Sequence, residues 1–229
     1  MQFLESSILG LRSAFYELSS PDKKLKFLIF PMVHIGDPLY YANIDQRLDA
    51  CDNVVYEGVK STKSWFLVQS YKLVVKRKSL GLVTQRSALS LQNRGLNLIH
   101  GDTTAEAFYE SWRKIPWYFR QLILLLSPLY GCWRYLTATR HSMAKGHTVD
   151  SLPESKEYAD EQANEAFQQA LIKDRDEVLL EVLKSHIESN ANKPQTTAII
   201  YGARHMPAVI SLLRRYGYTV TKSEWVQAI

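Results

Sequence analysis

The chain has 229 residues, of which 46% are hydrophobic and 22% are charged. This length and composition indicate a globular chain with a full hydrophobic core and exclude a disordered or fibrous protein. The two cysteines, Cys51 and Cys132, lie far apart in the sequence, which excludes a disulfide framework and a paired-cysteine metal site. The net charge is +5, and the first residues lack the basic segment of a signal peptide, so we expect a cytoplasmic protein without a cleaved export signal.

Apolar residues recur at close to helical spacing between Phe3 and Phe15, which predicts a helix over residues 1–20 packed outside a sheet. Short apolar runs rich in β-branched or aromatic residues predict strands at about 25–33, 53–57, 96–99, 197–201 and 218–220. Between these runs the pattern predicts helices from Pro38 to Leu48, over 63–78, over 82–93, from Thr103 or Thr104, over 153–190 and over 205–216. This alternation indicates an α/β fold with a largely parallel central sheet flanked by helices.

The segment 115–140 is the most apolar part of the chain. Its uncharged stretch, Gln121 to Trp133, has 13 residues and contains Pro128, so it is too short to span a bilayer. The favoured interpretation is a buried helical hairpin. We therefore predict a helical insertion around 103–150 within a single domain that covers residues 1–229.

Three of the predicted strands deliver an ionisable side chain where they end. His34 follows the first strand, Glu57 ends the second, and His205 comes shortly after the strand at 197–201. Because ligands bind at the carboxyl ends of the strands in open parallel sheets, we expect these side chains to share one site. Asp37 and Asp102 come at neighbouring strand ends. We expect one of them to orient a site histidine by accepting a hydrogen bond from its ring.

Two histidines and one carboxylate, with positions left open to water, are a ligand set of catalytic metal sites. A metal ion held by His34, Glu57 and His205 would make its bound water acidic enough to attack a substrate near neutral pH. Without a metal, a histidine paired with a glutamate acts as a general base on water. The structural alternatives are a hydrogen-bonded histidine at each strand end and a buried ion pair for Glu57.

These residues resemble the motifs of the TraB/PrgY/GumN family, which includes the Tiki metalloproteases, within the wider group of erythromycin esterase and ChaN-like proteins. That family carries two G-x-x-H motifs and a strand-end glutamate. The second motif is present as Gly202-Ala203-Arg204-His205, the glutamate corresponds to Glu57, and the first motif reads Pro31-Met32-Val33-His34, with proline in the glycine place. The family also has an arginine before the last motif, and Asp174-Arg175-Asp176-Glu177 is similar, with Asp176 in the place of an asparagine.

The resemblance covers about 25–216 and implies a metal-dependent, peptidase-like hydrolase. It implies that His34, Glu57 and His205 hold a divalent ion, Zn²⁺, Mn²⁺ or Co²⁺, that Glu57 is also a candidate general base, and that Arg175 contacts an anion or the transition state. The expected substrate is a peptide or a small molecule. Two alternatives stay open, because esterase-type relatives hydrolyse without metal and ChaN-like relatives bind haem: a metal-free hydrolase, or a non-catalytic protein that sequesters a peptide or haem.

Residues 58–149 form a cationic, tryptophan-rich lobe with 14 Lys or Arg, three acidic residues and four of the five tryptophans. Tryptophan beside basic residues on a short apolar segment is typical of elements that hold to a membrane surface, so peripheral association with an anionic membrane is one prediction. The other interpretation is a core lobe whose basic residues are solvated or pair with the acidic segment 150–165. We expect no nucleic-acid partner, because no base-stacking or helix-turn-helix signature is present.

Overall fold

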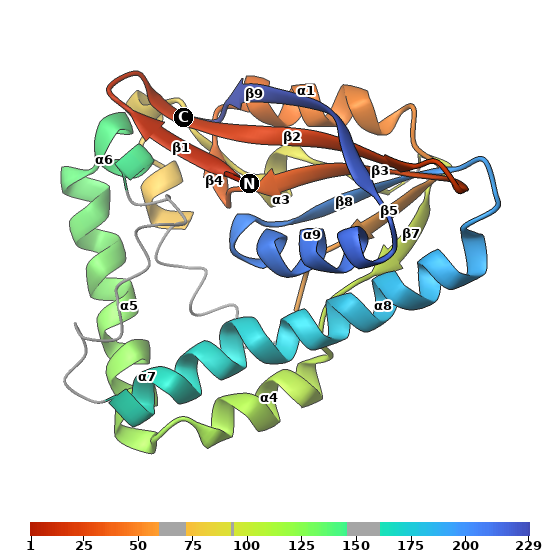
Figure 1. The fold of residues 1–229 in the computed structure, drawn as a ribbon. Helices are drawn as coiled ribbons and strands as arrows, with labels where there is room; N and C mark the ends of the chain where they lie inside the picture. Colours follow the sequence, from red (N-terminus) through yellow and green to blue (C-terminus); the bar gives the residue numbers. More distant parts are fainter. Residues whose placement is uncertain (60–71, 93, 146–160) are drawn as a thin grey trace.

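The computed structural model describes residues 1–59, 72–92, 94–145 and 161–229. Its centre is a seven-stranded mixed sheet. The strands of this sheet are β1 Leu4–Ser7, β2 Gly10–Ser20, β3 Lys23–Met32, β5 Asn53–Tyr56, β7 Asn97–His100, β8 Thr196–Gly202 and β9 Thr219–Gln227. Strands β3, β8, β5 and β7 lie side by side in that order and run parallel, whereas β1, β2 and β9 are antiparallel additions (Figure 1). The predicted α/β fold with a largely parallel sheet is confirmed.

Helices cover both faces of the sheet (Figure 1). The helices are α1 Pro38–Leu48, α3 Gln85–Ala88, α4 Ala105–Lys114, α5 Trp117–Thr137, α6 Arg140–Lys145, α7 Glu161–Gln168, α8 Asp174–Asn190 and α9 Met206–Arg215. On one face α1 packs through Tyr40 against Phe15, and on the other α8 packs through His186 against Phe27. Because both faces are covered, consecutive residues such as Ala14 and Phe15 are both buried.

The helix predicted over residues 1–20 is wrong, because this segment is the β1–β2 hairpin. Ile8, which contributed to the helical spacing, lies in the turn between these strands and is 88% exposed. Strand β2 pairs with β9 along one edge and with β1 and then β3 along the other. These long-range pairings satisfy the backbone of β2, and they outweigh a local apolar pattern that a helix would also fit.

The buried hairpin predicted over 115–140 is also wrong. The segment forms one continuous helix, α5, which includes Pro128 and buries only Gly131 among its residues. The inner side of α5 packs at its N-terminal end on a second small core of Phe108, Trp112, Ile115 and Ala170. The apolar run therefore does not fold back on itself, and most of its large side chains stay outside both cores.

Two further helix predictions fall partly outside the described residues. Of the segment 63–78, residues 63–71 are not described, and of the segment 153–190, residues 153–160 are not described.

The helix predicted over 82–93 is wrong for most of its length. Strand β6 Val83–Thr84 pairs with β4 Ile35–Gly36 in a separate two-stranded sheet, and α3 is the helical part of the described residues 82–92. From residue 161 onward the prediction of helix, as one long helix or two in line, is confirmed by α7 and α8 (Figure 1).

A π-helical turn over Gln169–Lys173 joins α7 to α8. The turn widens the helix by one residue directly before Asp174. Asp174 accepts hydrogen bonds there from Gln169 and from Ser111 of α4. Ala170, within the turn, is buried in the second core, whereas Leu179 and Leu183 of α8 are buried against the main sheet.

Gly10 begins β2 with φ of +121° and lies against the last residue of the chain. A Cβ at this position would come within 2.1 Å of the Ile229 carbonyl oxygen. We expect Gly10→Ala to lower the free energy of unfolding by more than about 1 kcal/mol, since the conformation and the contact both exclude a side chain. Urea denaturation measures this loss.

Gly58→Ala is the matched control, because a Cβ at Gly58 meets nothing within 4 Å. It should change the free energy of unfolding by less than about 0.5 kcal/mol. Equal stability of the two variants would contradict the packing of the C-terminus on Gly10.

Candidate functional site

The four parallel strands place the predicted site residues along one edge of the sheet. Met32 of β3 lies opposite Gly202 of β8, and Tyr56 of β5 lies opposite Ile200 of β8 and His100 of β7. The segments that follow these strands therefore emerge next to one another. They carry His34, Glu57, Asp102 and His205.

Glu57 is the carboxylate at the centre of this edge, and its side chain is only 10% exposed. Its Oε1 accepts a hydrogen bond from Arg175 Nη2 at 2.5 Å, and its Oε2 accepts one from the Gly202 backbone N–H at 2.7 Å. Burial alone would raise the pKa of Glu57, but the charge of Arg175, followed by His34 and His205, lowers it to about 2. Glu57 is therefore an anion at neutral pH.

Arg175 extends from α8 and binds two carboxylates at once. Its Nε donates to Asp102 Oδ1 at 2.9 Å and its Nη2 to Asp102 Oδ2 at 2.7 Å, in addition to the bond with Glu57. The Asp102 side chain is fully buried and also accepts from the backbone N–H groups of Gly58 and Thr103. Burial alone would lower the pKa of Arg175. Its bonds to Asp102 and the charge of Glu57 outweigh this effect, and the pKa of Arg175 lies above its usual value. This bidentate geometry suits a guanidinium and not an ammonium group.

Gly202 explains why the second motif begins with glycine. A Cβ at Gly202 would lie 3.1 Å from Glu57 Oε2 and 3.5 Å from His205 Cδ2. The Gly202 backbone has φ of −53°, so the requirement comes from close approach and not from an unusual backbone conformation. A side chain here would press on the carboxylate that the Gly202 N–H binds.

His205 is 3% exposed and pairs with Asp176 of α8. The distance from His205 Nδ1 to Asp176 Oδ1 is 2.7 Å. Because an ionised carboxylate only accepts hydrogen bonds, the neutral tautomer that fits this pair carries its proton on Nδ1 and leaves the lone pair on Nε2. The ring also meets Tyr201 edge-to-face, with 4.8 Å between centroids.

The Tyr201 hydroxyl lies beside Asp102 and makes no hydrogen bond of good geometry within the described part of the chain. Its ring is also 5.8 Å from the Arg175 guanidinium carbon. Burial and the neighbouring carboxylates Glu57 and Asp102 raise the pKa of Tyr201, against the opposing charge of Arg175. Tyr201 therefore remains a neutral phenol.

His34 is exposed in the turn between β3 and β4, and its backbone oxygen accepts from the Gln85 N–H at 3.0 Å. It lies near enough to Glu57 to lower the pKa of that carboxyl group. Pro31, in the glycine place of the first motif, is buried in β3. Its carbonyl accepts hydrogen bonds from Ser13 Oγ and Tyr40 Oη, at 2.8 and 3.0 Å.

Asp37 and Asp102, predicted to orient a histidine, make other contacts. Asp37 caps α1 through the Leu39 N–H and pairs with Arg140, and Asp102 binds Arg175. The carboxylate that pairs with a histidine is instead Asp176, which stands in the sequence as a variant of the family's arginine-asparagine pattern. The sequence feature that could have indicated Asp176 is its place directly after Arg175. Neighbouring helix residues point about 100° apart, so these two side chains reach different strand ends.

The predicted metal-ligand set does not fit a preformed ion site. Within the described ranges, no three His, Cys, Asp or Glu side chains are grouped as metal ligands. Both oxygens of Glu57 already accept N–H donors, from Arg175 and from Gly202. A metal ion that used Glu57 as a ligand would have to compete with the Arg175 guanidinium, which Asp102 also binds.

Arg175→Met should destabilise the fold by about 3–5 kcal/mol, since it leaves two buried carboxylates without their cation. Urea denaturation near neutral pH measures this. Arg113→Met removes an exposed i,i+3 pair with Glu110 and should cost less than about 1 kcal/mol. A small loss at Arg175, similar to that at Arg113, would contradict a buried network.

The low pKa of Glu57 predicts a pH dependence of stability. The folded state lowers this pKa from 4.5 to about 2, so stability from ionised Glu57 is complete above about pH 4.5 and is lost as the pH falls toward 2. The free-energy difference between wild type and Glu57→Gln should therefore shrink between about pH 6 and pH 3. Glu224→Gln, at an exposed pair with Arg47, should show a smaller change. A difference for Glu57→Gln that is independent of pH would contradict the lowered pKa.

The comparisons with known proteins agree with the motifs. Residues 135–222 match the model of the TraB/PrgY/gumN family. This range includes Arg175, Asp176 and the Gly202–His205 motif, whereas His34, Glu57 and Asp102 precede it. No curated protein and no solved structure matches the chain. Residues 135–222 of the chain are therefore similar to the TraB/PrgY/gumN family.

Proposed function

We propose that the chain is a hydrolase of ester or peptide bonds in which His205 is the general base. The observation that carries this proposal is the pairing of His205 Nδ1 with Asp176 Oδ1 at 2.7 Å. An acceptor-only carboxylate on Nδ1 fixes the tautomer in which Nε2 takes up a proton. A carboxylate and a histidine held in this way form the base-orienting half of many hydrolytic sites.

In the proposed reaction a water molecule attacks the substrate carbonyl carbon and gives its proton to His205 Nε2. The proton then passes to the leaving oxygen or nitrogen as the bond from the carbonyl carbon to that atom breaks. Ionised Glu57 stabilises the imidazolium that forms, because its negative charge already interacts with His205. Arg175 and the Gly202 N–H hold Glu57 in place and keep it ionised.

His34 is assigned the contact with the substrate. It is exposed, and it follows the strand next to β8, so it lies on the solvent side of the same edge. An imidazole N–H there is suited to donate to the carbonyl oxygen as negative charge develops on it. Arg175, predicted from the resemblance as an anion contact, acts in this proposal through Glu57 and not on the substrate.

The metal-dependent form predicted from the sequence assigns His34, Glu57 and His205 to a divalent ion. That form requires Glu57 to share or release its bonds to Arg175 and Gly202. The metal-free form requires no such rearrangement, so the present contacts support it better. The two forms differ in a single measurable property, the metal requirement.

The variants His205→Ala and Asp176→Asn test the base. With nitrophenyl esters and a library of quenched fluorescent peptides as probes, His205→Ala should lower kcat/KM by about 10²–10⁴-fold, the usual contribution of a general base. Asp176→Asn should lower kcat with little change in KM, since it disturbs only the tautomer. His141→Ala, at an exposed histidine of α6, should leave turnover unchanged.

Equal loss in all three variants, or turnover that survives in His205→Ala, would refute the assignment of the base. Tight binding of a peptide or haem without turnover would favour a sequestering protein.

Metal dependence is tested on the same substrates. After treatment with a chelator, the metal-free form should keep its turnover, and metal analysis should find no stoichiometric ion. Loss of turnover with the chelator and recovery with Zn²⁺, Mn²⁺ or Co²⁺ would overturn the metal-free form in favour of the metal-dependent one.

A further inference from the structure

Helix α5 presents an unusual apolar surface to solvent. Leu125 is 66% exposed, Leu129 60% and Leu136 72%. The large apolar residues of α5 that are exposed are Trp117, Tyr118, Leu122, Leu125, Leu126, Leu129, Tyr130, Trp133, Tyr135 and Leu136. Single exposed leucines are ordinary, but ten large apolar side chains on one helix mark a contact surface.

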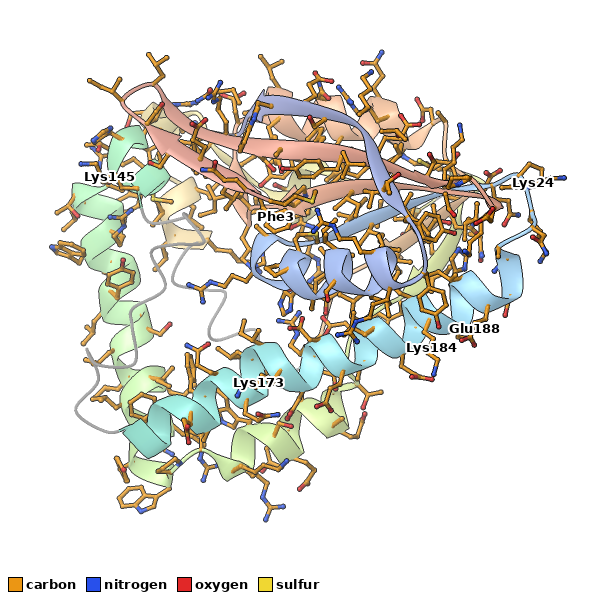
Figure 2. The ribbon with its side chains drawn as sticks, in the orientation of Figure 1. Phe3, Lys24, Lys145, Lys173, Lys184 and Glu188 are labelled. Atoms are coloured by element: carbon orange, nitrogen blue, oxygen red, sulfur yellow. The ribbon has the colours of Figure 1, made fainter. Side chains whose placement is uncertain are left out.

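The exposed leucines form a continuous stripe. Tyr118, Leu122, Leu125, Leu129 and Leu136 recur at intervals of three, four or seven residues, which places them on one side of the helix. With 21 residues the helix is about 31 Å long. Side chains project from its outer side, away from the sheet (Figure 2).

Exposed aromatic residues also lie on α5, and most of them are near its two ends. Trp117 and Tyr118 open the helix, and Trp133 and Tyr135 come near its end. Rings with one polar group favour the boundary between lipid chains and water. No described helix is long and apolar enough to cross a membrane, α5 included, so the arrangement suits a helix that lies in the membrane surface.

The segment that contains α5 carries charge of one sign. From residue 111 to residue 145 the chain has no Asp or Glu, and it carries Arg113, Lys114, Arg120, Arg134, Arg140 and Lys145. Two of these residues pair with acidic residues outside the segment, Arg113 with Glu110 and Arg140 with Asp37. Arg113 and Lys114 are exposed just before the helix, and Lys145 lies beside its other end (Figure 2). Basic residues next to an apolar face complement anionic lipid headgroups.

This charge pattern also argues against a second copy of the chain as the occupant. A second copy of this segment has no acidic residue to pair with the exposed basic residues near the ends of α5, Arg113, Lys114 and Lys145, because residues 111–145 contain no Asp or Glu. Helix pairs in water use opposite charges beside the apolar seam. A planar anionic surface meets both the leucine stripe and the flanking cations.

The helix is held in place before any partner binds. At its start, Phe119 and Ile123 pack on the second core. At its end, Arg77 Nη1 donates to the carbonyl oxygens of Leu136 and Ala138, both at 2.9 Å. A surface fixed at both ends loses little conformational freedom on binding.

We propose that α5 is a membrane-surface helix that attaches the chain to anionic bilayers. The helix stands on the side of the molecule where β3 ends (Figure 1), and Arg140 of α6 binds Asp37 near that edge. Attachment through α5 therefore brings the carboxyl edge of the sheet toward the lipid surface. The proposal is independent of whether the site hydrolyses a substrate.

Sedimentation of the full chain with vesicles tests the proposal. The chain should sediment with phosphatidylcholine vesicles that contain phosphatidylserine and remain in the supernatant with phosphatidylcholine alone. Raising the salt concentration should weaken the binding, because the basic residues are screened. Leu125→Ser combined with Leu129→Ser should weaken it by about tenfold or more, since both leucines would enter the interface.

Val220→Ser is the control, because Val220 is 38% exposed near the start of β9, where this strand pairs with Leu18 of β2 and not with any part of α5. It should change vesicle binding by less than about twofold, and circular dichroism should show that all variants are folded. Failure to sediment with anionic vesicles at low salt would overturn the proposal, as would binding that the double substitution leaves unchanged. A dimer in light scattering that the double substitution converts to monomer, without vesicle binding, would assign the face to self-association instead.

Discussion

The contact between Arg175 and the two carboxylates Glu57 and Asp102 holds the functional edge of the sheet together. Glu57 follows β5, Asp102 follows β7 and Arg175 comes from α8, so one guanidinium joins three elements distant in sequence. Two carboxylates this deeply buried would repel each other and lack solvation without a cation between them. The loop N–H groups of Gly58 and Gly202 complete the network. His34 and His205 therefore lie near a carboxylate, Glu57, that this network holds in place and keeps negatively charged.

Much of this edge could be predicted from the sequence, because charge at the end of a buried apolar run is rare. Glu57 after Val54-Val55-Tyr56 is the clearest case, and parallel strands bring such ends together. The partner of His205 could not be predicted in this way. Asp176 lies 29 residues earlier in the chain and reaches His205 only because α8 begins beside the strand ends. The position of that helix start depends on tertiary packing, which a local pattern does not contain.

Two of the errors in the fold have a common physical origin. In both the N-terminal hairpin and α5, the local apolar pattern does not specify the surface that packs against it. Residues such as Phe15 are indeed buried, but as part of a strand whose two edges are paired by β3 and β9. The leucines of α5 remain outside, because the second core occupies only the inner side at one end. Hydrophobicity predicts that a surface is to be covered, and it does not predict what covers it.

The π-helical turn over Gln169–Lys173 changes the direction in which side chains point between two helices that pack on separate cores. After the turn, Leu179 and Leu183 pack α8 against the sheet. Before the turn Phe167, and within it Ala170, pack on the second core with residues of α4 and α5. If α7 and α8 formed one uninterrupted α-helix, the side chains that face one core would be rotated by about one residue, or 100°, away from the position that the other core requires. The extra residue takes up this mismatch directly before Asp174, Arg175 and Asp176. Insertions and deletions within these five residues are therefore expected to be far less tolerated than substitutions, because they would rotate the tryptophan-rich lobe relative to the sheet while leaving each core intact.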